Sequence, residues 1–169
     1  AIAVGHQSYL GEGANWAVFL DAFGEVSVLD GDTWSISSHP SPCLTTNDVA
    51  LWQGSETLVF LACADGSVGW LELSESGSLS SIADNTFVVA ESSIDYIVVD
   101  ESCVWSASQE DSGVSVSCFD PELFDIGAGP FTTGRTGLNH MAQTDSHLVM
   151  LHGGDDLTKL DKGTGAGAT

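Results

Sequence analysis

Carboxylates dominate the side chains that could do chemistry. The chain of 169 residues contains 24 Asp and Glu against 3 Lys and Arg, which gives a formal net charge of −21. Two carboxylates at a suitable separation can act as the acid and base of a glycosidase, and several together can hold a divalent cation. Their number alone indicates neither function, because it fits equally well a solvated surface or one that attracts basic proteins.

The scarcity of Lys and Arg, and the absence of known catalytic motifs, restrict the partners and activities that the sequence allows. Nucleic-acid binding requires clustered Lys and Arg, so we exclude nucleic acid as a partner. The chain has no Gly-x-Ser-x-Gly elbow, P-loop, dinucleotide fingerprint or His-Glu-x-x-His motif. We therefore expect no catalytic residues, no cofactor and no enzyme activity. No apolar run approaches the ~18 residues of a membrane-spanning helix, so no membrane span is expected.

The cysteines are spaced in a way that disfavours a zinc site, because no Cys-x-x-Cys pair is present. If Ala107 pairs with Val114 in a hairpin, Cys103 lies directly opposite Cys118. That register is compatible with a disulfide in an oxidising compartment and with two facing thiols in a reducing one. The sequence leaves the compartment open between the cytoplasm and an extracellular or virion setting. The four cysteines are Cys43, Cys63, Cys103 and Cys118.

The histidines do not indicate a metal site either. His147 and His152 are five positions apart on one expected strand, so they point to opposite faces and cannot share a metal ion. We therefore expect no metal ligands. The remaining histidines are His6, His39 and His140.

A complete β-hairpin within residues 49–82 is the element around which the chain is organised. Leu58 to Ala64 is an apolar run, Asp65-Gly66 fits a two-residue type I′ turn, and Ser67 to Leu73 follows as the second strand. With Ala64 opposite Ser67, both faces of the hairpin are mostly apolar. We therefore expect the hairpin to be covered on both sides.

The same pattern recurs along the chain in units of about 42 residues. Similar hairpins are expected at 17–29, 102–119 and 148–160. A shorter apolar strand precedes each of the four hairpins, at Tyr9-Leu10, 49–52, 94–99 and 138–142. Connectors rich in Ser, Pro and Gly separate the units, at 39–42, 74–81 and 127–137.

Residues 49–82 resemble a WD40 repeat, which is one blade of a β-propeller. Asp65 stands where such repeats carry their turn aspartate, although Leu71-Glu72 replaces the usual Trp-Asp pair. A second stretch, 27–34, resembles the Asp-box hairpin of sialidase-like propellers, with Leu29 where that motif has its Asp. Asp30 and Asp32 in this stretch could contact calcium or could belong to a solvated turn.

Sheets with two apolar faces cannot stand alone in water, and stacking them buries both faces. We therefore predict an all-β fold, a β-propeller or partial propeller of about four blades, in which an arc would be completed by further sequence or by another chain. Residues 1–162 are expected to form one domain and 163–169 a Gly-rich tail. The repeats are expected at about 1–38, 39–83, 84–129 and 130–162.

The resemblance to WD40 blades implies that hairpin turns and the connectors into each first strand share one rim. This rim would be acidic and free of Lys, so we expect a non-enzymatic scaffold that docks a basic protein or a neighbouring subunit. The alternatives are a structural component of an extracellular or viral assembly and an extracellular propeller hydrolase. The expected partner-binding residues are Asp48, Asp65, Asp84, Asp95, Glu110, Asp111, Asp155 and Asp156.

Overall fold

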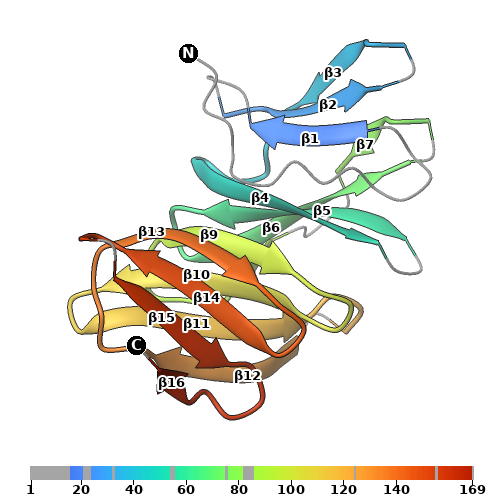
Figure 1. Cartoon of the computed structure of the whole chain (residues 1–169). Helices are drawn as coiled ribbons and strands as arrows, with labels where there is room; N and C mark the ends of the chain where they lie inside the picture. Colours follow the sequence, from blue (N-terminus) through green and yellow to red (C-terminus); the bar gives the residue numbers. More distant parts are fainter. Residues whose placement is uncertain are drawn as a thin grey trace.

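The computed structural model describes residues 16–20, 24–31, 33–53, 56–74, 76–81, 86–123, 125–154 and 156–168. In this part of the chain the regular elements are all β-strands, which form four antiparallel sheets (Figure 1). The described residues contain no helix with the length and apolar character needed to cross a membrane. The expectation of an all-β chain is confirmed at this level.

The second sheet contains the hairpin expected within residues 49–82. Its strands follow one another in space as they do in the chain, and β8 pairs with the same strand, β6, as β7 does. The outer strand of this sheet is therefore formed by two short segments. The strands are β4 (Thr46–Gln53), β5 (Thr57–Cys63), β6 (Ser67–Leu73), β7 (Leu79–Ser80) and β8 (Thr86–Val88).

The turn of this hairpin differs from the expected type I′ turn. Ala62 pairs with Val68, so the loop has one residue more than predicted, and Phe60 rather than Leu61 lies opposite Trp70. The amide of Gly66 donates to the carbonyl of Cys63, and Gly66 has a φ of 85°. This is a type I turn closed by a glycine in the left-handed region, the usual geometry of a three-residue hairpin loop.

The third sheet has the order β12-β11-β10-β9. Here the expected register is wrong by two residues, because Ala107 pairs with Val116 and not with Val114. The strands also run further toward the turn, so that Glu110 pairs with Gly113 and the loose turn predicted at 108–113 is a tight one. The strands are β9 (Ile94–Val99), β10 (Val104–Glu110), β11 (Gly113–Asp120) and β12 (Asp125–Thr132).

The first and fourth sheets lie at the two ends of the stack. The strands of the first are β1 (Trp16–Leu20), β2 (Val26–Asp30) and β3 (Ile36–His39). Those of the fourth are β13 (Leu138–Gln143), β14 (His147–His152), β15 (Leu157–Asp161) and β16 (Gly167–Ala168). The strand expected at Tyr9-Leu10 lies outside the described residues.

Two expectations about the connectors are wrong. Most of 127–137, expected as a connector, belongs to β12, which pairs with β11. The Gly-rich end, expected as a tail, forms β16, whose Gly167 pairs with Leu160. Outer strands are exposed and do not require apolar side chains, so their Ser, Gly and Pro residues resemble those of a loop.

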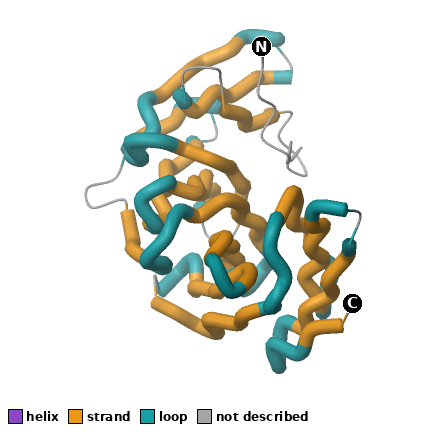
Figure 2. The backbone as a smooth tube through the Cα atoms, turned by 90° about the vertical axis from the view of Figure 1, so that its left-hand side faces the viewer, coloured by secondary structure: helices purple, strands orange, loops and turns teal. Residues whose placement is uncertain are grey.

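The sheets pack face to face in the order in which they occur in the chain. Strand β1 contacts β4, β4 contacts β9, and β9 contacts β13. Figure 2 shows the resulting curved stack from the side. Three apolar cores lie between successive sheets, and their centres are marked by Leu61, Phe60 and Met150.

The second and third sheets are buried on both faces. Val59 and Leu61 point toward the first sheet, while Phe60 between them points toward the third. There the ring of Phe60 meets that of Phe119 edge to face, with 5.5 Å between centroids. A side chain of this size stabilises the fold by ~1.5–3 kcal/mol when it is fully buried. The covering of both hairpin faces that the sequence predicts is therefore present.

Candidate interaction surface

One edge of the stack brings together the hairpin tips and the connectors that enter the first strands. The amides of Val89 and Ala90 donate to the carbonyl of Gly66 at 3.1 Å each. In the fourth sheet the amide of Gly153 donates to the carbonyl of Gly137 at 2.8 Å. We call this the turn edge; it comprises the tips of the hairpins β5–β6, β10–β11 and β14–β15 with the connectors 40–45, 89–93 and 133–137.

Two of the predicted partner-binding residues fasten the strands to one another. Asp48 is 5% exposed, and its carboxylate accepts from the amide of Val49 at 2.9 Å and from the amide of Ile97, on β9, at 3.1 Å. Asp95 accepts from the amide of Gln109 at 2.9 Å. Both carboxylates satisfy backbone N–H groups within the fold, so they are not displayed to a partner.

Two further predicted partner-binding residues form polar contacts with nearby side chains at the turns. Asp65 accepts from the hydroxyl of Ser67 at 2.6 Å and from its amide at 3.0 Å, and these hydrogen bonds hold the pKa of Asp65 below its ordinary value. Asp156 pairs with Arg135 at 3.2 Å. Asp65 therefore keeps its charge at neutral pH and shapes the hairpin tip, whereas the charge of Asp156 is balanced by the guanidinium.

Glu110 and Asp111 are the predicted residues best placed to meet a partner. Both are exposed, at the tip of the hairpin formed by β10 and β11. Asp84 and Asp155 lie outside the described residues. The structure therefore brings six of the eight predicted carboxylates to the turn edge or to strands that begin there, but it displays chiefly the pair at this one tip.

Acidic side chains are not confined to the turn edge. The opposite edge, which we call the far edge, carries the exposed residues Glu101, Glu122 and Asp145 in the turns β9–β10, β11–β12 and β13–β14. Asp30 also lies toward the end of β2 and accepts from the hydroxyl of Thr33 at 2.8 Å, within the stretch that resembles an Asp-box hairpin. Exposed or partly exposed carboxylates therefore lie at both edges of the stack.

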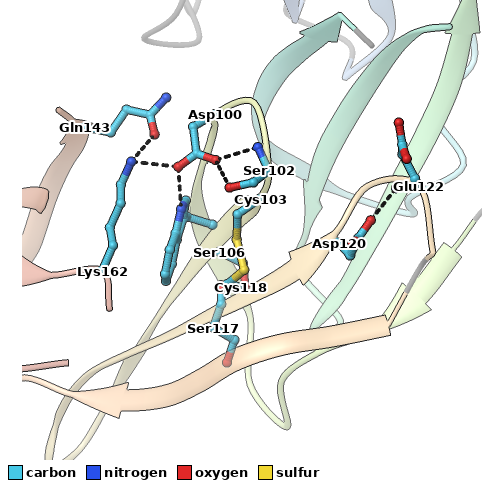
Figure 3. Close-up of a disulfide and its surroundings, with 11 residues drawn as sticks. Asp100, Ser102, Cys103, Ser106, Ser117, Cys118, Asp120, Glu122, Gln143 and Lys162 are labelled. Atoms are coloured by element: carbon cyan, nitrogen blue, oxygen red, sulfur yellow. Dashed lines mark hydrogen bonds and ion pairs between the residues drawn. A yellow bond between two sulfur atoms is a disulfide. The ribbon is translucent and has the colours of Figure 1, made fainter. Parts of the chain in front are cut away.

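A polar cluster at the far edge was not predicted. The carboxylate of Asp100 accepts from Lys162 Nζ at 2.7 Å and from the indole of Trp105 at 3.0 Å, and Lys162 also donates to Gln143 at 2.9 Å (Figure 3). Burial alone would raise the pKa of Asp100, but the hydrogen bonds from Lys162, Ser102 and Trp105 outweigh it and lower the pKa. The cluster ties the fourth sheet to the third.

Two disulfides brace the second and third sheets. Cys103 and Cys118 are joined across the hairpin β10–β11, with 5.7 Å between their Cα atoms (Figure 3). The pair lies diagonally across the strands, because Cys118 is opposite Trp105 in the register. Cys43 is joined to Cys63 with 5.3 Å between Cα atoms. This second pair was not predicted from the sequence, although Cys43 and Cys63 are the two cysteines that remain once Cys103 and Cys118 are paired.

Comparisons with known proteins give the fold but no family. No family model matches the chain, and no curated protein sequence does. Among solved structures, it is similar to the crystal structure of the computationally designed Ika8 protein, with a TM-score of 0.65 and 18% sequence identity. The match covers 99% of this chain and 50% of that one, so this chain spans about half the length of the designed protein. At this identity the likeness concerns the fold alone.

Within the described ranges, no three His, Cys, Asp or Glu side chains are grouped in a way that could hold a metal ion. The exposed carboxylates of Glu110 and Asp111 stand at a convex tip, where water is not excluded and charge acts over a distance. Such groups can orient and attract a basic partner.

Proposed function

We propose that this chain is a non-enzymatic interaction module, an arc of propeller-like sheets whose turn edge docks a basic segment of a partner protein. The observation that carries the proposal is the exposed pair Glu110 and Asp111, presented by a hairpin that the Cys103–Cys118 disulfide braces. Charge of one sign on an exposed tip raises the rate of association and sets the orientation of a basic partner.

The propeller-like arrangement is supported by the packing order. Four antiparallel sheets follow the chain, and their first strands β4, β9 and β13 contact one another in sequence. The similarity to a solved structure of twice the length is consistent with an arc that continues through further sheets. Radial stacking of this kind leaves hairpin tips in a row along one edge, which is the arrangement that a docking surface needs.

The proposal is tested by binding to a lysine-rich synthetic peptide, measured by fluorescence anisotropy at low and at physiological ionic strength. The variant E110Q/D111N removes two charges from the turn edge. The matched control E101Q/D145N removes two exposed charges from the far edge. We expect affinity to weaken about fivefold for the first variant and less than twofold for the control, because the Debye length is only ~8–10 Å.

The same titration separates a docking surface from general attraction. If both variants weaken binding equally, the peptide responds to the net charge of −21 and not to the turn edge. Binding that does not change with ionic strength would also exclude the proposal, since an electrostatic contact between exposed groups must be screened by salt.

A second candidate function is a structural component of an extracellular or virion assembly. The two disulfides favour it, because disulfides form and persist in oxidising compartments and are rare in the cytosol. A measurement of free thiols in protein isolated from its native source tests the compartment. Four free thiols would remove the support for this candidate.

A further inference from the structure

One face of the fourth sheet is largely apolar and exposes two leucines to solvent. Leu148, Met150 and Leu160 point toward the third sheet and are buried. Side chains alternate along a strand, so their neighbours point the other way. Of these, Leu151 is 37% and Leu157 is 55% exposed. We call this surface the end face; it comprises Ala142, Val149, Leu151, Leu157 and Lys159.

The corresponding faces of the preceding sheets are covered. On β5 the side chains of Leu58 and Phe60 lie in the core against β9. On β10 those of Trp105 and Ala107 lie in the core shared with the fourth sheet. Val149 and Leu151 occupy the same side of β14 that these residues occupy on β5 and β10. The end face therefore corresponds to these covered faces of the second and third sheets, but no further sheet of the described residues packs against it.

The first sheet offers a surface that could cover the end face. Its side facing away from the second sheet carries the half-buried apolar residues Ala17, Phe19 and Leu29, the buried Ser27, which is 1% exposed, and Ile36, which is 62% exposed. All Lys and Arg residues of the chain lie at position 135 or beyond, so this side of the first sheet carries no cation. Lys159, on the end face, would meet a neutral or acidic surface there.

We propose that the end face binds the first sheet of a second copy of this chain, in a head-to-tail contact that continues the stack. The three contacts between successive sheets within the chain are of this type, and a fourth would bury Leu151 and Leu157 as the internal contacts bury Phe60. A head-to-tail contact closes into a ring if its rotation allows and otherwise extends into a filament. Two copies would equal the length of the similar designed protein, of which one copy covers 50%.

This contact is independent of the turn edge, and salt distinguishes the two. Each copy carries a net charge of −21, so copies repel one another and screening favours their association. Docking of a basic peptide on the turn edge responds in the opposite sense. Self-association that strengthens with salt and peptide binding that weakens with salt therefore report on two different surfaces of the same protein.

Sedimentation velocity of the intact chain over a range of concentrations tests the proposal. The variant L151S/L157S changes two exposed leucines of the end face, so the fold of one copy is retained, which far-UV circular dichroism checks. The control L44S/L123S changes two leucines that are 99% and 75% exposed elsewhere. We expect dimers or larger assemblies for the natural sequence and the control, and an apparent Kd at least about tenfold higher for the end-face variant.

A mixing experiment identifies which surface of the second copy covers the end face. The single variant I36K places a charged side chain on the first sheet, at a position that the contact would remove from water. Alone, I36K and L151S/L157S are each expected to be largely monomeric. Mixed, they can form one intact contact, in which the end face of the I36K chain binds the first sheet of the other, so heterodimers should appear.

Three results would overturn the proposal. The natural sequence could stay monomeric at every concentration and salt, or L151S/L157S could associate as strongly as the control. The variant I36K alone could also associate as strongly as the natural sequence while L151S/L157S is disrupted, which would point to a contact between two end faces instead of a head-to-tail one.

Discussion

The second and fourth sheets have the same strand order but different surroundings. The second sheet is covered on both faces, by the first sheet on one side and the third on the other. In the fourth, the face that holds Met150 is covered, while Leu157 on its other face is 55% exposed. The comparison indicates that each sheet is stabilised by the sheets packed against it. Substituting a side chain should therefore lower the free energy of unfolding most where a neighbouring sheet covers that side chain.

The largest loss of stability is expected for a substitution in the core between the second and third sheets. The variant F60A should lower the free energy of unfolding by ~3–5 kcal/mol, because it removes a fully buried ring and leaves a cavity. The variant L157A, on the end face, should change the stability of the monomer by less than about 0.5 kcal/mol. Denaturant titrations at a concentration where the chain is monomeric measure both. Equal losses would show that the end face is covered within one copy.

The disulfides should make the next largest difference. The variant C43S/C63S removes a bridge between residues 20 apart in sequence, and C103S/C118S removes one between residues 15 apart. Each should lower the free energy of unfolding by ~3 kcal/mol, because the bridge restricts the unfolded chain. Thermal unfolding with and without reductant measures this effect. If reductant leaves the transition of the natural sequence unchanged, the bridges contribute nothing to stability.

A smaller effect is expected where a carboxylate joins two sheets. The variant D48A removes the acceptor for the amide of Ile97 and should cost ~1–3 kcal/mol, the penalty for a buried donor without a partner. The variant D111A, at the exposed hairpin tip, should be neutral within ~0.5 kcal/mol. Urea unfolding of the two variants compares them. A stability loss for D111A as large as that for D48A would contradict the assignment of Asp48 as structural and Asp111 as displayed.

The smallest effect is expected at the contact of the fourth sheet with the third. Lys162 donates a hydrogen bond to Asp100, whose pKa is lowered in the folded protein. The ionised carboxylate therefore stabilises the fold fully above its ordinary pKa of about 3.9. This stabilisation is lost as the pH falls through the lower pKa of the folded state. The variant K162M should lose ~1–2 kcal/mol at neutral pH and less at acid pH. Stability measured between pH 7 and 2 tests this sign; a difference that grows on acidification would be opposite to it.

The sequence predicts the inner parts of the sheets well because those parts are buried on both faces. A continuous apolar run identified β5, an alternating pattern after the Asp65-Gly66 turn identified β6, and a shorter apolar strand placed β9 at its observed bounds, Ile94–Val99. The outer strands β12 and β16 were not predicted, since one face or edge meets water and their composition is that of a loop. The registers of two hairpins were wrong because turn length depends on the conformation of residues such as Gly66, which composition does not reveal.

The candidate site was predicted less completely than the fold. The turn positions of Glu110 and Asp111 follow from the hairpin pattern, and the pairing of Cys103 with Cys118 from a strand register, although the register differs. The pattern could not show that Asp48 points inward to the amide of Ile97. It also could not show the contact of Lys162 with Asp100, because residues 62 apart in sequence meet only after the sheets have stacked.

Hydrogen exchange at low and high protein concentration tests most directly whether the stack continues beyond its fourth sheet. We predict that amides of β14 and β15, together with those of β1 to β3, become more protected as the concentration rises, while those of β5 and β6 do not change. Exchange that is independent of concentration, or new protection that appears at the tip of β10–β11 instead, would contradict the account.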